Sequence, residues 1–137
     1  MAHSLLMAHD FISRLPIYVH KNSPISEVVE KMDKYSVGKI TVTDENFNIS
    51  GSISRIEIIR YLGKNRIKAD SESYKKLKVS DILKPQTSFI TAYPSTDLKD
   101  MQRIMIASSS EYLPIAKDPW NKTLLGFVFL NHIVNIN

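Results

Sequence analysis

A glycine, a hydroxyl and a carboxylate follow one another at short spacing in the first half of the chain: Gly51, then Ser54, then Glu57. Glycine lets the backbone turn or approach a ligand closely. The Ser54 hydroxyl can donate a hydrogen bond to a phosphate, and a carboxylate can accept from both hydroxyls of a ribose. If a helix begins here, its N-terminus favours a nearby anion. The spacing therefore suits a ligand that carries ribose and phosphate.

Lys39 adds a positive charge to this candidate site, because it begins the preceding predicted strand and can reach a phosphate as a point charge. A second interpretation needs no ligand. Ser54 and Glu57 have the Ser-x-x-Glu spacing of a capping box, which satisfies the first backbone donors of a helix. The two interpretations of this pair are compatible. Lys39 by itself also fits a solvent-facing strand position.

The sequence lacks the residue patterns of glycine-rich phosphate loops, metal sites and catalytic carboxylate pairs. With glycine only at positions 38, 51, 63 and 126, neither common glycine-rich phosphate loop can form. The four histidines, His3, His9, His20 and His132, have no metal-ligand spacing, and the chain has no cysteine. Asp97 and Asp100 suit a helix start better than a catalytic pair. We therefore expect a protein that is not an enzyme and uses no metal and no cofactor.

The composition is that of an ordinary globular protein. The chain has 137 residues, 43% hydrophobic and 23% charged, which suits one domain or two small repeats with a shared core. The absence of cysteine fits a reducing compartment. The apolar run at residues 5–8 is too short to span a bilayer or to form a signal-peptide core. We expect a cytoplasmic protein without a membrane segment.

The chain repeats itself with a shift of 73 residues. The shift aligns apolar residues of helical and strand-like segments: Ile25 with Leu98, Val28 with Met101, Met32 with Met105, Ile40 with Leu113 and Val42 with Ile115. After a two-residue difference in a hairpin, Gly51 aligns with Gly126. Upstream, residues 10–12 align with residues 81–83. An internal repeat of this kind determines the architecture.

Each repeat predicts the same order of elements. In the first repeat these are an extended segment at 17–19, a helix from Ile25, strands at 39–43 and 49–54, and a helix at 55–62. In the second they are an extended segment at 89–91, a helix from Leu98, strands at 112–116 and 124–129, and a helix from Asn131. The predicted fold class is therefore α/β (α+β), with two β-α-β-β-α repeats related by pseudo-twofold symmetry.

We predict four segments: an N-terminal extension at 1–8, a first repeat at 9–63, a basic linker at 64–78 and a second repeat at 79–137. The extension is set apart because Met1-Ala2-His3 recurs as Met7-Ala8-His9. The linker carries six basic and two acidic residues, the whole of the net charge of +4. A basic connector can touch nucleic acid, but only Tyr74 offers an aromatic ring there, so a solvated linker is the favoured interpretation.

The pattern resembles the CBS repeat, named after cystathionine beta-synthase, in the tandem form called a Bateman module. The resemblance covers residues 9–134. Its motifs are 113–115, Leu-Pro-Ile, similar to the family's Leu-Pro-Val strand; 126–128, Gly-Phe-Val, similar to Gly-Ile-Ile; and 51–59, similar to the ribose and phosphate motif Gly-x-x-Ser/Thr-x-x-Asp. The sequence departs from the family at Thr41, which replaces proline, and at Glu57, which replaces the commoner aspartate.

The resemblance implies a regulatory module that senses an adenine nucleotide of the AMP, ADP or ATP type, or else S-adenosylmethionine or NAD, in a cleft between the repeats. It also implies a homodimer and an effector protein that reads the ligand state. The implied binding residues are Lys39, Ile53, Ser54 and Glu57, completed from the partner repeat by Thr87, Ile90, Ser110 and Tyr112.

The second repeat departs from the motif at the corresponding positions. Phe129 stands in place of the serine or threonine, after Val128, and His132 stands in place of the acid. A phenyl ring cannot donate to a phosphate, so we expect a degenerate second site and one nucleotide per chain. Two alternatives stay open: a structural or oligomerisation module with decayed sites, and a weak nucleic-acid binder that uses the basic linker.

Overall fold

The computed structural model describes residues 6–83 and 89–133. The chain divides into two compact units. The first-repeat unit is Ile17–Phe89, and the second-repeat unit joins Met1–Pro16 to Ile90–Asn137. Among the described helices, none is both long and apolar enough to cross a membrane.

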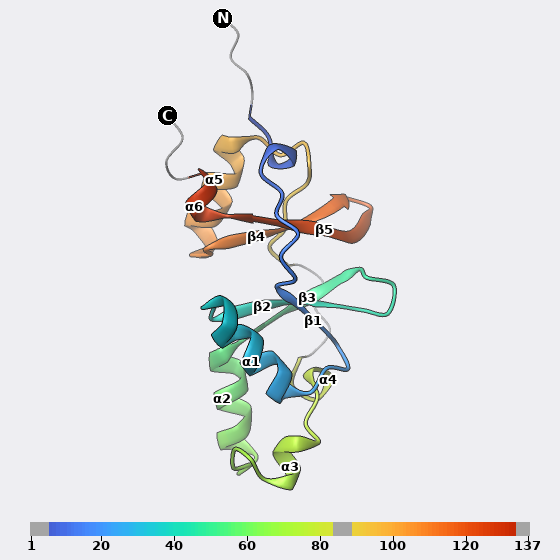
Figure 1. Cartoon of the computed structure of the whole chain (residues 1–137), viewed down its shortest axis with the longest axis vertical. Coiled ribbons are helices and arrows are strands. Elements are labelled where there is room, and N and C mark those ends of the chain that lie inside the picture. Colours follow the sequence, from blue (N-terminus) through green and yellow to red (C-terminus); the bar gives the residue numbers. More distant parts are fainter. Residues whose placement is uncertain (1–5, 84–88, 134–137) are drawn as a thin grey trace, which may run out of the picture. The chain divides into compact units, whose positions relative to one another are not determined.

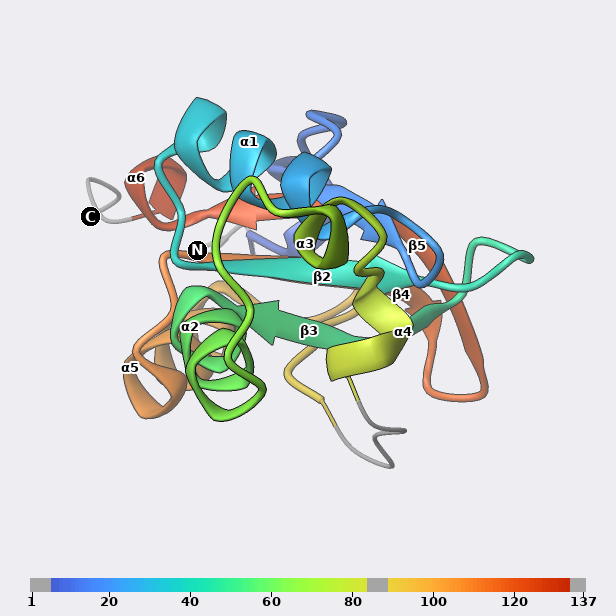
Figure 2. The same ribbon diagram turned by 90° about the horizontal axis from the view of Figure 1, so that it is seen from below.

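The first-repeat unit is a three-stranded sheet with helices on one side (Figures 1 and 2). Strand β2 (Lys39–Thr43) lies in the middle, parallel to β1 (Tyr18–His20) and antiparallel to β3 (Ile49–Ser54). The helices are α1 (Ile25–Tyr35), α2 (Arg55–Lys64), α3 (Glu72–Lys75) and α4 (Val79–Ile82). Helix α1 buries Ile25, Val28 and Met32, the predicted apolar stripe. These side chains and the inward residues of the strands form the core of the unit.

The second-repeat unit contains a two-stranded antiparallel sheet of β4 (Tyr112–Asp118) and β5 (Asn121–Phe129). Its helices are the short 3-10 helix η1 (Ala8–Asp10), α5 (Leu98–Ser108) and α6 (Leu130–Ile133). One cluster forms its core: Ala8, Ala92, Met101, Met105, Leu113, Ile115, Val128 and Ile133.

The strand pairing of the two hairpins shows the internal repeat predicted from the sequence. Val42 pairs with Gly51 in the first hairpin, and Ile115 pairs with Gly126 in the second. Both glycines have positive φ angles, 151° and 155°. Equivalent residues therefore occupy equivalent strand positions in the two repeats.

The helix ends repeat as well. Helix α1 is followed by Ser36 and helix α5 by Ser109, each in the left-handed conformation, and these serines are 73 positions apart. In each case the serine N–H donates to the last turn of its helix, which satisfies carbonyl groups that the helix leaves unpaired.

The extended segment predicted at 89–91 forms no strand: residues 89–91, which the structure describes, are followed by an isolated parallel bridge between Ala92 and Ile115. This bridge corresponds to the Val19–Val42 pair of the first sheet. The ladder cannot extend as it does in the first repeat, because Pro114 has no N–H to donate at the position equivalent to Thr41. Among the described residues, the second sheet consequently has two strands where the first has three.

Residues 6–8, predicted to lie in an extension outside the fold, are part of the second-repeat unit. Ala8 is fully buried, and its N–H donates to the Thr96 carbonyl at 2.8 Å. The Leu98 N–H donates to the Leu6 carbonyl at 2.9 Å. The segment upstream of the first repeat therefore packs on the second repeat.

The reciprocal arrangement holds for the segment upstream of the second repeat. The Val79 N–H donates to the Ser23 carbonyl at 3.0 Å, and the Ile25 N–H donates to the Leu77 carbonyl at 2.9 Å. The aligned segments at 10–12 and 81–83 are thus equivalent. Residues 10–12 precede the first hairpin but belong to the second-repeat unit, and residues 81–83 precede the second hairpin but belong to the first-repeat unit. The compact units and the predicted repeat boundaries divide the chain differently.

The segment 64–78 is folded rather than a plain solvated linker. It contains α3, whose start is capped because the Ser71 hydroxyl accepts from the Tyr74 N–H. Leu77 is buried, with 6% of its surface exposed. The basic side chains are exposed, as a solvated segment requires, but the backbone that carries them is anchored in the first-repeat unit.

Candidate functional site

Helix α2 begins at Arg55 and is capped by Ser54, the last residue of β3. The Ser54 hydroxyl oxygen accepts from the Glu57 N–H at 3.1 Å, and Glu57 Oε1 accepts from the Ser54 N–H at 2.9 Å. The two bonds satisfy donors that the first turn of a helix cannot satisfy internally. The predicted capping box is therefore confirmed, and it explains why the chain turns from strand to helix here.

The side chains that form the capping box can still make further hydrogen bonds to a ligand. The Ser54 oxygen accepts one hydrogen bond, and its own O–H is still able to donate. Glu57 uses one carboxylate oxygen, so its second oxygen can accept from a ribose hydroxyl. Both side chains are partly exposed. The structural and the ligand-binding roles can thus be filled by the same pair of residues.

Two basic residues flank Ser54. Lys39 is its cross-strand partner in the β2–β3 register and is exposed. Arg55 follows Ser54, and its guanidinium contacts the Asp33 carboxylate at 3.1 Å. Arg55 was not among the residues predicted from the sequence. Its place as the first residue of the helix, next to the candidate hydroxyl, was the available signal.

The structure brings Lys39, Ser54 and Glu57 together at one end of the first-repeat unit. Ile53 is completely buried in the core of this unit.

The remaining predicted residues lie elsewhere in the chain. Ile90, Ser110 and Tyr112 belong to the second-repeat unit. Ile90 is 44% exposed, whereas Tyr112 is 8% exposed. Thr87 lies outside the described residues. The completion of the site by these residues stays a prediction.

Aromatic rings occupy the equivalent position of the second repeat. Tyr112 and Phe129 are cross-strand partners, as Lys39 and Ser54 are in the first repeat, and their ring centroids are 6.0 Å apart. Phe129 also contacts the imidazole of His132 edge to face at 5.6 Å. Val128 is buried and His132 is exposed. This end of the hairpin therefore presents rings where the first repeat presents a lysine, a hydroxyl and a carboxylate.

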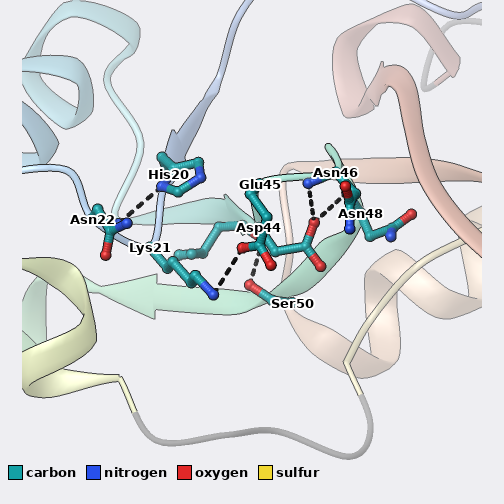
Figure 3. Close-up of polar contacts among 9 residues, drawn as sticks. His20, Lys21, Asn22, Asp44, Glu45, Asn46, Asn48 and Ser50 are labelled. Carbon is teal, nitrogen blue, oxygen red and sulfur yellow. Dashed lines mark hydrogen bonds and ion pairs between the residues drawn. The ribbon is translucent and has the colours of Figure 1, made fainter.

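The opposite end of the first sheet carries a polar cluster around the β2–β3 turn (Figure 3). Asp44 Oδ1 accepts from the backbone N–H groups of Asn46 and Asn48 at 2.9 and 3.0 Å, which fixes the turn. Lys21 Nζ contacts Glu45 Oε2 at 2.8 Å. The hydrogen bond from Lys21 lowers the pKa of Glu45, and the bond to Glu45 raises the pKa of Lys21. The contacts tie the end of β1 to the turn.

In the described ranges, no three histidine, aspartate or glutamate side chains gather closely enough to hold a metal ion.

Comparisons with known proteins add to this geometry. Residues 5–64 match the profile of the CBS domain. A search of curated proteins found no match.

Among solved structures, the CBS domain pair of protein MJ0100, in complex with 5-methylthioadenosine and S-adenosyl-L-methionine, is 21% identical, with 95% of this chain and 94% of that chain covered and a TM-score of 0.68. CBSX2 in complex with AMP is 20% identical, with 94% and 93% covered and a TM-score of 0.69. The cytosolic domain of the Mg2+ channel MgtE in complex with ATP is 18% identical, with 96% and 48% covered and a TM-score of 0.68.

These solved structures share the fold of this chain. The predicted resemblance and the predicted fold class are both confirmed. Residues 5–64 match the CBS domain profile, and over nearly its whole length the chain has the fold of CBS domain pairs.

Proposed function

We propose that the chain is a non-enzymatic, ligand-sensing module that binds an adenine nucleotide of the AMP, ADP or ATP type at the start of α2. The observation that carries the proposal is the Ser54–Glu57 pair, which caps the helix and keeps a donor and an acceptor for a ligand. Structures of the same fold have been solved with AMP, ATP and S-adenosyl-L-methionine, which supports a ligand of this class.

Each group at the site has a distinct part in the proposal. The Ser54 hydroxyl donates to a phosphate oxygen, and the second oxygen of Glu57 accepts from the ribose hydroxyls. Lys39 and Arg55 lie beside Ser54 and attract the phosphates. The N-terminus of α2, a ten-residue helix, adds a favourable dipole for an anion.

The proposed regulation depends on a difference in nucleotide affinity between two conformations of the module. A nucleotide shifts the population only as far as it binds one conformation more tightly than the other. An effector protein that contacts the favoured conformation then reads the nucleotide concentration. The module itself needs no catalytic residue, metal or cofactor for this role.

Calorimetry with AMP, ADP, ATP and adenosine tests the assignment. Glu57→Gln is the informative variant, because glutamine keeps an oxygen for the Ser54 N–H but replaces the second acceptor by a donor. We expect Glu57→Gln to fold normally and to weaken nucleotide binding by about tenfold or more, the cost of a lost hydrogen bond to a charged group. His132→Gln serves as the matched control and should bind as the unmodified chain does.

Adenosine separates the phosphate contacts from the ribose contacts. It should bind more weakly than AMP, and Lys39→Met should reduce the difference between the two. If none of the four ligands binds, the nucleotide assignment is wrong and a structural CBS module takes its place. Binding that is indifferent to Glu57→Gln would move the site away from α2.

We also propose that the module acts as a homodimer with an isologous interface. Ile106 on α5 is 78% exposed and Leu130 on α6 is 37% exposed, and exposed apolar side chains of this size favour association. Sedimentation should give a dimer for the unmodified chain and a monomer for Ile106→Glu.

A further inference from the structure

The net positive charge of the chain is concentrated on one stretch of the first-repeat unit. Residues 60–78 carry seven basic and two acidic side chains, and the rest of the chain carries 11 basic and 12 acidic ones. The stretch runs from the second half of α2 through a turn into α3 and on to the start of α4. All seven basic residues are exposed: Arg60, Lys64, Arg66, Lys68, Lys75, Lys76 and Lys78.

The charges are held on a folded scaffold. The Asn65 N–H donates to the Tyr61 carbonyl at 3.0 Å, and the Ile67 N–H donates to the Leu62 carbonyl at 2.9 Å. Arg66 has a left-handed backbone with φ of 52°, which makes the turn compact. A surface that is already ordered loses less conformational entropy on binding than a mobile tail does.

Most of these cations are uncompensated. Within the described part of the chain, Lys75 forms an ion pair with Glu72 at 3.7 Å, and the other six basic side chains form none. An acidic partner would therefore gain attraction without first displacing internal ion pairs.

An apolar patch continues this basic surface along α2. Ile56 is 65% exposed and Ile59 is 61% exposed, and they lie three residues apart on one side of the helix. Arg60 and Gly63 follow on the same side at helical spacing. A Cβ atom built on Gly63 meets nothing within 4 Å, so this side of the helix is open. The outward side of α2 is thus apolar in its first half and basic toward its end.

From this surface we infer a docking site for an acidic amphipathic segment of a partner protein. Apolar side chains of such a segment cover Ile56 and Ile59, and its carboxylates meet Arg60, Lys64 and the basic turn. Helical segments that present an apolar face beside charged residues bind protein surfaces in this way.

Two features favour a narrow acidic segment over a nucleic acid or an anionic bilayer. The rings in this stretch, Tyr61 and Tyr74, are partly buried. Burial is the main cause of the raised pKa of Tyr74, and the negative charges of Asp70 and Glu30 raise it further. These rings are poor stacking platforms for bases. Helix α1 packs against α3 and exposes Glu27 and Glu30, which repel a broad polyanionic surface.

Fluorescence anisotropy with three probes tests the inference: a labelled helical peptide of leucine and glutamate, a duplex DNA, and vesicles of phosphatidylcholine with phosphatidylserine. We expect the peptide to bind most tightly, with an affinity that falls as salt is added. Lys64→Glu with Lys68→Glu should weaken the peptide by about tenfold or more, and Ile56→Ser with Ile59→Ser should also weaken it. Lys99→Glu with Lys117→Glu makes the same charge change in the second-repeat unit and should leave binding unchanged.

Tighter binding of the DNA or the vesicles than of the peptide would overturn the inference. Equal peptide binding by the Lys64→Glu, Lys68→Glu variant and its control would also overturn it. All the substituted side chains are exposed, and circular dichroism verifies that each variant is folded. Nucleotide binding at the start of α2 is measured separately, so failure of this surface and failure of the nucleotide site are distinguishable.

Discussion

Gly126 lies against the backbone of Ser13, so closely that a Cβ atom at position 126 would be 2.5 Å from the Ser13 carbonyl oxygen. The contact belongs to a two-way bridge. The Ser13 N–H donates to the Phe127 carbonyl at 2.7 Å, and the Phe127 N–H donates to the Ser13 carbonyl at 2.9 Å. Glycine at this position therefore allows the segment upstream of the first repeat to join the second hairpin.

Gly126→Ala should destabilise the protein strongly. Alanine would meet backbone atoms of Ser13 and would have to adopt a φ of 155°, which L-residues rarely do. We expect a loss of about 2 kcal/mol or more in the free energy of unfolding, measured with urea. Gly63→Ala is the control, because that position is helical and open, and there alanine should stabilise by about 0.5–1 kcal/mol. Equal effects at the two positions would contradict the close approach.

Ala8→Asp should also destabilise the protein, although residue 8 precedes the first repeat. Ala8 is fully buried in the core of the second-repeat unit, so the aspartate would bring an unpaired charge into an apolar cluster. We expect a loss of about 2 kcal/mol or more. Ala69→Asp makes the same change at an exposed position and should have little effect. Hydrogen exchange should show the loss of protection in α5 and β5. Full protection there in Ala8→Asp would mean that residues 6–8 do not belong to this unit.

Calorimetry should give about one nucleotide per chain. The candidate site of the first repeat has a hydroxyl, a carboxylate and a lysine, whereas the equivalent position of the second repeat has the rings of Tyr112, Phe129 and His132. Each missing hydrogen bond to a charged group costs about 1.5–3 kcal/mol, so the second position should be weaker by orders of magnitude. Two equal sites per chain would contradict this reasoning.

The ion pair between Lys21 and Glu45 should be visible in a pH titration. The pKa of Glu45 is lowered in the fold, so the stabilisation is lost as the pH falls through that lowered pKa. The pKa of Lys21 is raised, so the stabilisation is also lost as the pH rises through that raised pKa. The pair therefore contributes between about pH 4 and pH 10.

NMR titration of the Glu45 carboxyl tests this expectation. Lys21→Met should return the Glu45 pKa toward its ordinary value, and added salt should do so in part, because both groups are exposed. A Glu45 pKa that is the same in Lys21→Met and in the unmodified chain would assign the shift to the turn instead.

Much of the fold could be predicted because it depends on local signals. The apolar spacing of Ile25, Val28 and Met32 predicts α1, and the same spacing 73 residues later predicts α5. The Ser-x-x-Glu motif predicts where α2 begins, since a capping box acts within one helical turn.

The candidate site could be predicted only where its residues are close in the sequence or paired in one hairpin. Lys39, Ser54 and Glu57 meet these conditions, and the structure brings them together. Arg55 was missed because an arginine in a helix has no distinctive spacing. Its ion pair with Asp33, 22 residues away, depends on how α1 and α2 lie in the unit.

The sequence by itself determined the repeat, the type and order of most elements and the helix start that carries the candidate site, because periodicity and capping act over a few residues. Only the tertiary structure decided which hairpin each upstream segment joins, because the 6–13 and 77–83 segments have similar local sequences and are distinguished by contacts with distant backbone. It also decided the loss of a strand in the second sheet, since the missing N–H of Pro114 matters only once Ala92 pairs with Ile115 and the residues before Ala92 lie alongside Pro114. The tertiary structure likewise decided the burial of Ala8 and Leu77, because the residues that cover them are distant in the sequence.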